Sequence, residues 1–336
     1  MGFLKQLIMD EDTLNKLADF STVEDFLSFI APFYPNLKIS KNTIEEIEKS
    51  LYDVFFRLIG KLIFISPLNI RRFLKDYLSK YEIMNIKQII LGSIIGMDIE
   101  EKSKNVNFLI EKYLENTDFI KKLIEISSLD RIQLFMKTTK YNKAIREGIL
   151  YFKKYNEIFV LEAFLDRLYY INLMERERRF NEKEREMISF YDLFMTEIYN
   201  INLIYRGILN KIDPQLLNQF IVRNYLFLDE RKIDILLNQG TLQDFFSKVD
   251  EFLGRIIQLD YHISLSTFEH PIWELDGLYT KYYFKKFKIK IDDIEYLTIY
   301  RIIELIIKKE KEVKLYIIPN LVKIINNKFS RLEKMD

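Results

Sequence analysis

Apolar residues recur at helical spacing along most of this chain. Between residues 47 and 62 they follow one another at steps of three and four, which places them on one face of a helix. These residues are Ile47, Leu51, Val54, Phe55, Leu58, Ile59 and Leu62. The same spacing returns at 161–169 and at 299–306, whereas strict two-residue alternation is short and rare. The pattern therefore predicts an all-α fold.

Prolines fall between the helical stretches or at their ends. A proline has no backbone N–H and cannot continue an α-helix without losing a hydrogen bond. We therefore expect each of the six to mark a helix boundary, namely Pro32, Pro35, Pro67, Pro214, Pro271 and Pro319. No linker rich in Gly and Ser separates domains, so we expect neighbouring domains to pack along continuous helices.

A short motif occurs three times in the chain. The copies are LADFSTVEDF at 17–26, LIEISSLDRI at 123–132 and LLNQGTLQDF at 236–245. Each copy indicates the end of one helix and the start of the next. A hydroxyl at Thr22, Ser128 or Thr241 can accept a hydrogen bond from the exposed N–H groups of the following helix. We therefore predict that these three residues are N-caps.

Two further motifs follow each copy in the same order. The first is a carboxylate near the start of a helix, at Glu48, Glu162 and Glu274. The second holds Asn85 in the first copy, Asn202 in the second and Leu315 in the third. These residues have no catalytic companion, so we interpret Glu48, Asn85, Glu162, Asn202 and Glu274 as repeated structural positions. Such polar groups fix the orientation of packed helices when their hydrogen bonds are satisfied.

The threefold repetition predicts three similar helical lobes. We place them at 1–111, 112–225 and 226–336, because the motifs recur at intervals of a little over one hundred residues. A period of this length is too long for a helical solenoid unit of about 34–47 residues. Three such lobes in one chain can close into a pseudo-threefold ring or funnel.

The composition argues against several classes of protein function. Fifty-one Lys and Arg balance fifty Asp and Glu, which argues against a general nucleic-acid binder. The absence of Cys excludes disulfides and thiolate metal sites. Arg57 and Lys61 interrupt the most apolar stretch, so we expect no transmembrane span. For the basic, aromatic stretch at 281–290, we favour a surface that meets an acidic protein or a membrane complex.

Candidate catalytic and metal-binding residues are sparse. His262 and His270 are eight positions apart and would not face one metal ion on a helix, so we interpret them as turn or surface residues. The string DDIEY at 292–296 is half of an Asp-rich magnesium motif, and Asp292 more simply begins a helix. We predict no catalytic residue, cofactor or metal. An all-α metal-dependent enzyme, resting on Asp292 and Asp293, and a plain helical scaffold remain the alternatives.

The repeat resembles that of a known family. The segments that carry the resemblance are Glu48 with Leu51, Glu82 with Asn85 and Ile86, Glu162 with Leu165, Asn202 with Leu203, and KEKEVKLYII at 309–318. In these the chain is similar to the C subunit of archaeal A-type ATP synthases, a relative of the vacuolar ATPase d subunit. The chain departs from the pattern at Tyr199, where an acid is usual, at Leu315, which replaces the last Asn, and at Gly277.

The resemblance implies a non-catalytic component of a rotary motor. A funnel of three helical lobes would sit on the proteolipid c-ring at the cytoplasmic face of the membrane, as a peripheral protein. It would receive the tip of the central axle, formed by subunits of the D and F types, and transmit torque for proton transport. The family has no catalytic residues and no cofactor to carry over, in keeping with the sparse candidate chemistry.

Overall fold

The computed structural model describes residues 6–39, 41, 43–176, 180–257, 264–288 and 294–332. Over these residues the regular structure is helical, and none of them lies in a strand. The prediction of an all-α fold is therefore confirmed. The chain divides into two compact units, one formed by 1–71 together with 290–336 and the other by 72–289.

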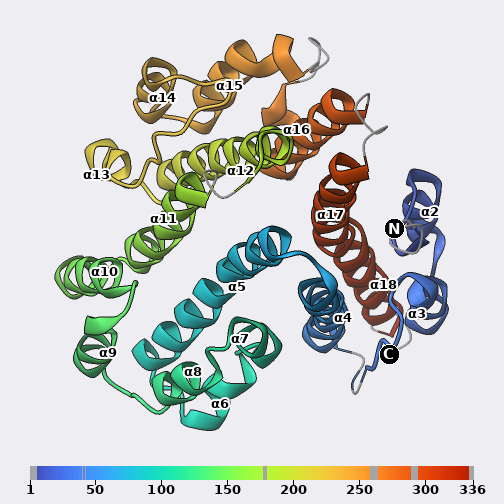
Figure 1. Cartoon of the computed structure of the whole chain (residues 1–336), viewed down its shortest axis with the longest axis horizontal. Helices are drawn as coiled ribbons and strands as arrows, with labels where there is room; N and C mark the ends of the chain where they lie inside the picture. The colour runs from blue at the N-terminus through green and yellow to red at the C-terminus, as the bar shows by residue number, and fades with distance from the viewer. Residues whose placement is uncertain are drawn as a thin grey trace. The chain divides into compact units, whose positions relative to one another are not determined.

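The first unit joins the two ends of the chain. Its N-terminal part holds α2 (Glu11–Lys16), α3 (Val23–Ile30) and α4 (Ile44–Ile65). Its C-terminal part is α17 (Ile294–Lys311), a π-helix (Glu312–Ile317) and α18 (Ile318–Leu332), which follow one another without a break. Figure 1 shows α18 next to α3 and α4, and residue contacts connect it to both.

The core of the first unit needs both ends of the chain. Apolar residues of the N-terminal helices and of α4 surround the π-helix and α18. The buried residues are Met9, Leu17, Phe26, Ile30, Tyr34, Ile47, Leu51, Val54, Val313, Ile317, Leu321 and Ile324. The apolar stripe predicted over 47–62 supplies three of them, because it lies on the buried face of α4.

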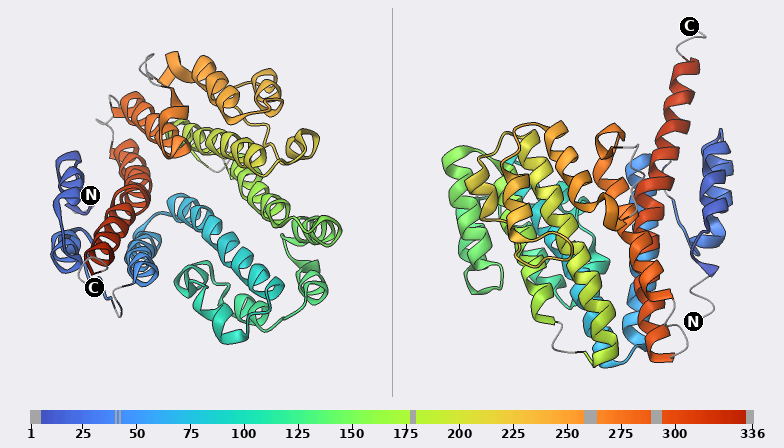
Figure 2. Two further views of the ribbon diagram at one scale, coloured as in Figure 1. Left: turned by 180° about the vertical axis from the view of Figure 1, so that it is seen from behind. Right: turned by 90° about the horizontal axis from the view of Figure 1, so that it is seen from above.

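The second unit contains long helices and groups of short ones, as the two views of Figure 2 show. The long ones are α5 (Leu68–Ile94), which begins in the first unit, α10 (Asn142–Tyr155), α11 (Ile158–Arg176), α12 (Glu182–Leu209), α15 (Leu242–Ile257) and α16 (Pro271–Phe287). The short ones are α6 (Ile99–Lys104), α7 (Phe108–Leu114), α8 (Thr117–Ile124), α9 (Leu129–Phe135), α13 (Pro214–Asn218) and α14 (Glu230–Leu237).

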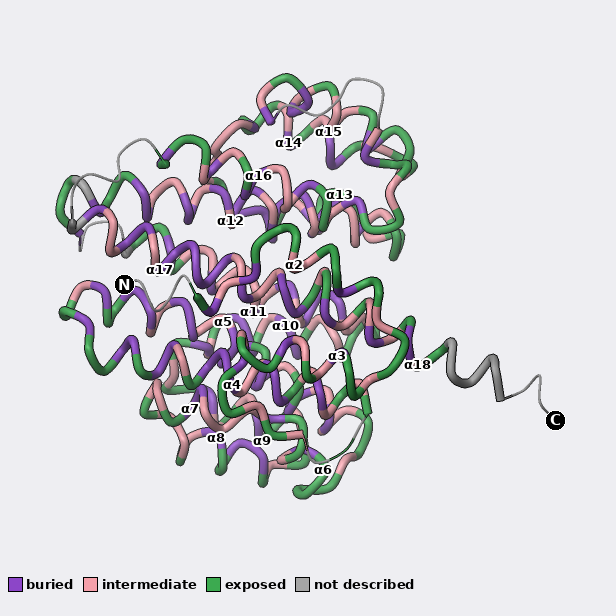
Figure 3. Tube along the Cα trace, turned by 90° about the vertical axis from the view of Figure 1, so that its right-hand side faces the viewer, coloured by how far each residue is buried: buried purple, intermediate pink, exposed green. Residues whose placement is uncertain are grey.

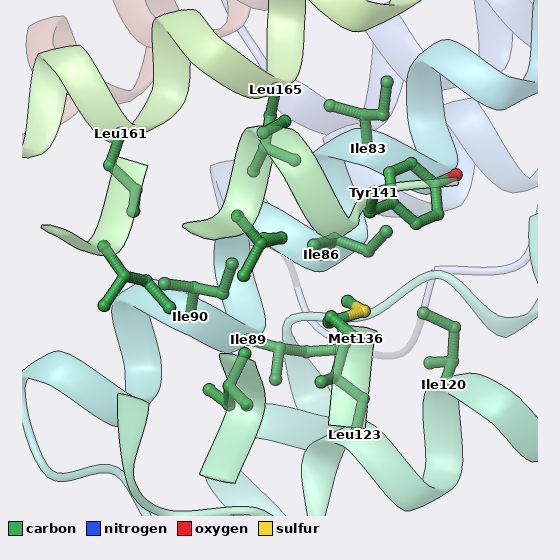
Figure 4. Packing of buried hydrophobic residues seen from close by; sticks show 14 of the residues in the cluster. Ile83, Ile86, Ile89, Ile90, Ile120, Leu123, Met136, Tyr141, Leu161 and Leu165 are labelled. Carbon is green, nitrogen blue, oxygen red and sulfur yellow. The ribbon is translucent and has the colours of Figure 1, made fainter. Parts of the chain in front are cut away.

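One core of this unit lies around the C-terminal half of α5. Ile83, Ile86, Ile89 and Ile90 pack against the short helices and against Leu161 and Leu165 of α11 (Figure 4). Buried positions recur along the long helices in Figure 3, as an amphipathic helix requires when one face is covered. This core takes residues from both 1–111 and 112–225, and the first of these boundaries falls inside α7. The division into three lobes stays a prediction.

The three predicted N-caps are confirmed. Thr22 Oγ1 accepts from Asp25 N at 3.2 Å, Ser128 Oγ from Arg131 N at 3.4 Å, and Thr241 Oγ1 from Asp244 N at 3.1 Å. In the first and third copies the hydroxyl also donates to the carboxylate three residues on, at 2.7 Å. The hydroxyl thus satisfies one N–H group that the first turn of a helix leaves unpaired.

Each of the six prolines lies between helices or within the first two residues of one. At Pro319, the second residue of α18, the boundary is a change of helix type, because the helical path continues from α17 through the π-helix into α18. A π-helix contains wider i→i+5 turns than an α-helix. It ends at Ile317, so the hydrogen-bond pattern changes close to the point where proline lacks a donor.

Two glycines in the second unit give a matched stability test. A Cβ at Gly207 of α12 would lie 2.2 Å from Leu217 Cδ1, and Leu217 is buried, whereas a Cβ at Gly277 of α16 would meet nothing within 4 Å. We expect Gly277→Ala to raise the free energy of unfolding by about 0.5–1 kcal/mol, the helix-propensity gain. Gly207→Ala should lower it by about 1 kcal/mol or more, because overpacking exceeds that gain. Denaturant midpoints of both variants check this, and a stabilised Gly207→Ala would contradict it.

Candidate functional site

Glu82 on α5 is one of the deeply buried polar residues of the second unit, with a side chain that is 1% exposed. Tyr141 Oη donates to Glu82 Oε2 at 2.5 Å, and Lys140 Nζ donates to the same oxygen at 3.0 Å. Asn116 Nδ2 donates to Oε1 at 2.6 Å. Both carboxylate oxygens are thus satisfied by residues 34 to 59 positions further along the chain. Glu82 therefore ties α5 to the segment that follows it.

Asn85, one turn along α5, completes what we call the α5 cluster (Glu82 and Asn85). Its Oδ1 accepts from Asn107 N at 2.9 Å, and its Nδ2 donates to Asn107 O at 3.2 Å. The Nδ2 group also donates to Glu111 Oε1 at 2.6 Å. The interpretation of Asn85 as a polar group that orients packed segments agrees with this geometry.

Glu111 is buried beside this cluster, and its Oε2 has no hydrogen-bond partner within the described residues. Burial raises the pKa of Glu111 to about 8, the nearby charge of Glu82 adds to the rise, and the Asn85 hydrogen bond opposes it. Burial disfavours the charged form of a carboxyl group. The surroundings of the α5 cluster therefore include an acid that stays protonated over much of the pH range.

The α12 cluster (Glu197 and Asn200) has the same construction. Glu197 Oε2 accepts from the N–H groups of Leu226, Phe227 and Leu228, each at 2.9 Å. Tyr279 Oη donates to Glu197 Oε1 at 2.5 Å. Burial raises the pKa of Glu197, while these hydrogen bonds lower it. The carboxylate thus binds an extended segment and α16 to α12.

Asn200 repeats the hydrogen bonds of Asn85. Its Oδ1 accepts from Val222 N at 2.9 Å, and its Nδ2 donates to Val222 O at 2.8 Å. In both clusters the asparagine binds the backbone of a residue 22 positions further on. Asn202, which the repeated motif paired with Asn85, lies two residues beyond and is half-buried. The geometry of Asn85 is reproduced by Asn200, not by Asn202.

A third group, the π-helix cluster (Lys309 and Glu312), lies in the first unit. Met9 N donates to Glu312 Oε1 at 2.8 Å, and Tyr34 Oη donates to Oε2 at 3.2 Å. Lys309 Nζ donates to Oε2 at 2.6 Å and to Phe33 O at 3.2 Å. The side chains of Lys309 and Glu312 are each only 2% exposed, and burial raises the pKa of Glu312 and lowers that of Lys309.

The three carboxylates share spacing and partners. Glu82, Glu197 and Glu312 are 115 residues apart at each step, and each accepts from one tyrosine hydroxyl. At this spacing Asn85 corresponds to Asn200 and to Leu315. The acid that was missing at Tyr199 is then Glu197. Sequence reasoning missed Glu197 and Asn200 and did not single out Glu312 within the segment 309–318, although the string Glu-x-x-Asn at 197–200 and the constant interval carry the signal.

The other repeated positions are placed differently. Glu162 accepts from Arg206 Nη2 at 3.0 Å and lies 4.0 Å from Lys87 Nζ, which also pairs with Asp166 at 3.0 Å. Glu48 on α4 is half-buried, and burial raises its pKa while Lys314 lowers it. Glu274 is exposed in the first turn of α16. The structure does not bring these three residues together with the buried clusters in one site.

The histidines and acids considered as possible metal ligands form no metal site in the described part of the chain. No three His, Asp or Glu side chains gather there in a way that could hold a metal ion. His270 is exposed and contacts Trp273 in a tilted arrangement with ring centroids 4.1 Å apart, while His262, Asp292 and Asp293 lie outside the described residues. Within the described residues, no helix has the length and apolarity needed to cross a membrane.

Comparison with known proteins identifies the family. Residues 3–333 match the family model described as ATP synthase (C/AC39) subunit. The chain belongs to this family. The resemblance found from the repeat is therefore confirmed.

Several similar proteins are each named as the C subunit of an A-type ATP synthase. The one from Methanocaldococcus jannaschii is 23% identical over 97% of this chain and 80% of its own length. The one from Methanosphaera stadtmanae is 21% identical over 72% of this chain and 62% of its own length. The one from Thermoplasma volcanium is 26% identical over 61% of this chain and 58% of its own length.

The contribution of a carboxylate–tyrosine hydrogen bond to stability can be tested by comparing two tyrosines of α16. We expect Tyr279→Phe to lower the free energy of unfolding by about 1.5–3 kcal/mol, because it removes a hydrogen bond to buried Glu197. Tyr282→Phe is the control, since Tyr282 stacks on Phe190 and its hydroxyl has no hydrogen-bond partner within the described residues. Equal losses in the two variants, measured by chemical denaturation, would show that the hydroxyl of Tyr279 contributes nothing specific.

Glu111 predicts a pH dependence of stability. Its pKa is about 8 in the folded chain against 4.5 for the free side chain, so the folded state holds the proton more tightly. Its contribution to stability is therefore complete below about pH 4.5 and is lost as the pH rises through about 8. Glu111→Gln cannot titrate, so the difference in unfolding free energy between wild type and this variant should shift by a few kcal/mol across that window. A pH-independent difference would contradict the prediction.

Proposed function

We propose that this chain is the non-catalytic adapter of an A-type rotary ATP synthase. It would join the central axle subunits, of the D and F types, to the proteolipid c-ring and transmit torque for proton transport. The observation that carries the proposal is the family match over residues 3–333, supported by relatives named as the C subunit of A-type ATP synthases. The protein would act at the cytoplasmic face of the membrane, as a peripheral component without cofactor or metal.

The buried polar groups support a mechanical role. A catalytic acid or base must reach a substrate, whereas Glu82, Glu197 and Glu312 are at most 2% exposed and bind their own chain. Each one joins the helix that carries it to a segment at least 29 residues away in sequence. Fixed helices of this kind resist deformation, and an adapter needs this property to pass torque between two partners.

We also propose that the chain consists of three similar lobes, near 1–111, 112–225 and 226–336, arranged as a pseudo-threefold funnel. The constant interval of 115 residues between the three buried carboxylates supports the repetition, as do the equivalent hydrogen bonds of Asn85 and Asn200. Glu48, Glu162 and Glu274 stay in the proposal as repeated positions, being the fifth, fifth and fourth residues of α4, α11 and α16. For the asparagine position we replace Asn202 by Asn200.

The proposal predicts that coupled ion pumping depends on this chain. The soluble motor with its axle is added to membranes that carry the c-ring, with and without the protein, and ATP hydrolysis and proton pumping are both measured. We expect ATP hydrolysis by the soluble motor to persist without the chain while pumping is lost, because torque no longer reaches the ring.

If the contacts with the axle and the c-ring are many and distributed, the loss of one side chain should matter far less than the loss of the whole chain. A single exposed substitution such as Leu134→Ala, at a side chain 70% exposed, should leave coupling intact, whereas no pumping should be recovered without the full chain. Fully coupled pumping in the absence of the protein would overturn the adapter function.

A further inference from the structure

The turn between α4 and α5 exposes the two most solvent-accessible large apolar side chains of the described residues. Phe64 is 84% exposed and Ile65 is 74% exposed in the last turn of α4, and Leu68 follows at 58% in the first turn of α5. Exposed apolar residues that stand alone are common, but a cluster of this kind indicates an interaction surface. We call these three residues the apolar turn.

Backbone hydrogen bonds hold the apolar turn in place. Ser66 N donates to Leu62 O at 3.0 Å and ends α4, and Arg71 N donates to Pro67 O at 2.8 Å at the start of α5. Only two residues, Ser66 and Pro67, lie between the helices, and Ser66 is extended and buried. Phe64, Ile65 and Leu68 are therefore presented by helix ends, and binding would cost little conformational entropy.

Only positive charge surrounds the apolar turn in the sequence. From residue 54 to residue 75 there are five cations and no acid, although the whole chain has a net charge of only +1. Lys61 and Arg71 are exposed on either side of the turn, and neither pairs with an acid within the described residues. Arg57, one turn further back on α4, lies 3.7 Å from Asp53.

We propose that the apolar turn, with Lys61 and Arg71, contacts the surface of an anionic lipid bilayer. Phe64, Ile65 and Leu68 would enter the headgroup region, and the two cations would bind lipid phosphates. Apolar side chains beside basic ones, with no acid, match the pattern of segments that lie in an anionic interface. Electrostatic complementarity requires negative charge opposite Lys61 and Arg71, and the phosphates of anionic lipids supply it. The inference deepens the proposed function, because it states which surface faces the membrane.

The test is flotation of the purified full chain with vesicles of phosphatidylcholine, with and without phosphatidylglycerol. We expect binding only to the anionic vesicles, with weaker binding as salt is raised. The double variant Phe64→Ser with Ile65→Ser should bind about tenfold more weakly, because the apolar area that enters the interface is lost. Lys61→Gln with Arg71→Gln should also lose about tenfold.

Ile95→Ser with Ile99→Ser is the matched control. Ile95 and Ile99 are 59% and 54% exposed, but acidic residues surround Ile99 at 98, 100 and 101. This control should bind like wild type. Thermal unfolding of all variants should be unchanged, because the substituted side chains are exposed.

Two outcomes would overturn the lipid contact. In one, Phe64→Ser with Ile65→Ser binds anionic vesicles as tightly as wild type. In the other, wild type ignores lipid vesicles and binds only those that contain the proteolipid ring. The second outcome would assign the apolar turn to a contact with a protein and would leave the adapter function intact. The adapter function is tested separately, by the proton-pumping assay with and without this chain. Failure of the lipid contact and failure of the adapter function are therefore distinguishable.

Discussion

A carboxylate inside a helical core must find donors, and for three carboxylates of this chain most donors lie far away in sequence. Glu82, Glu197 and Glu312 each accept a tyrosine hydroxyl and at least one further hydrogen bond from another segment. An unsatisfied buried carboxylate would cost several kcal/mol, so packings without these partners are strongly disfavoured. The need to satisfy these carboxylates therefore determines which segments pack against the helices that carry them.

Most of the stabilising free energy comes from apolar burial rather than from the polar clusters. The cores around α5 and around the π-helix are rich in Ile and Leu. Such side chains stabilise several packings almost equally, since a helix with isoleucines at 83, 86, 89 and 90 can slide by one turn and still bury an apolar face. Such a shift would break the hydrogen bonds of Glu82 and Asn85, and we infer that these bonds specify one register. Paired polar groups thus contribute specificity more than stability.

Local features of the fold could be predicted, and features that depend on distant partners could not. Thr22, Ser128 and Thr241 cap helices because the donors they satisfy lie three residues away, within the same motif. The pairing of Asn85 with Asn202 was displaced by two residues, because the backbone that distinguishes Asn200 lies 22 positions further on. Pro319 was expected to mark a helix boundary, and it is the second residue of α18, where the helix changes type instead of ending.

The candidate site was predicted only in part, for a related reason. Asn85 could be named because an asparagine recurs near the same place in two copies, whereas in the third copy Leu315 stands at that place, three residues after Glu312. Its partners, Met9 and Tyr34, come from the opposite end of the chain. No periodicity along α17 indicates such a contact. It becomes visible when the first and last segments are seen to share one core.

This shared core has a consequence for the order of events during synthesis. Met9 donates its N–H group to Glu312, 303 residues later, and the apolar residues beneath α3 include Val313, Ile317 and Leu321. At about 5–20 residues per second, translation leaves the N-terminal helices without these partners for roughly 15–60 s. The residues 72–289 are synthesised entirely within that interval and contain their own core. These helices therefore reach their final packing only after residues 312–324 have been made, and a chain stopped before residue 312 leaves their apolar faces exposed.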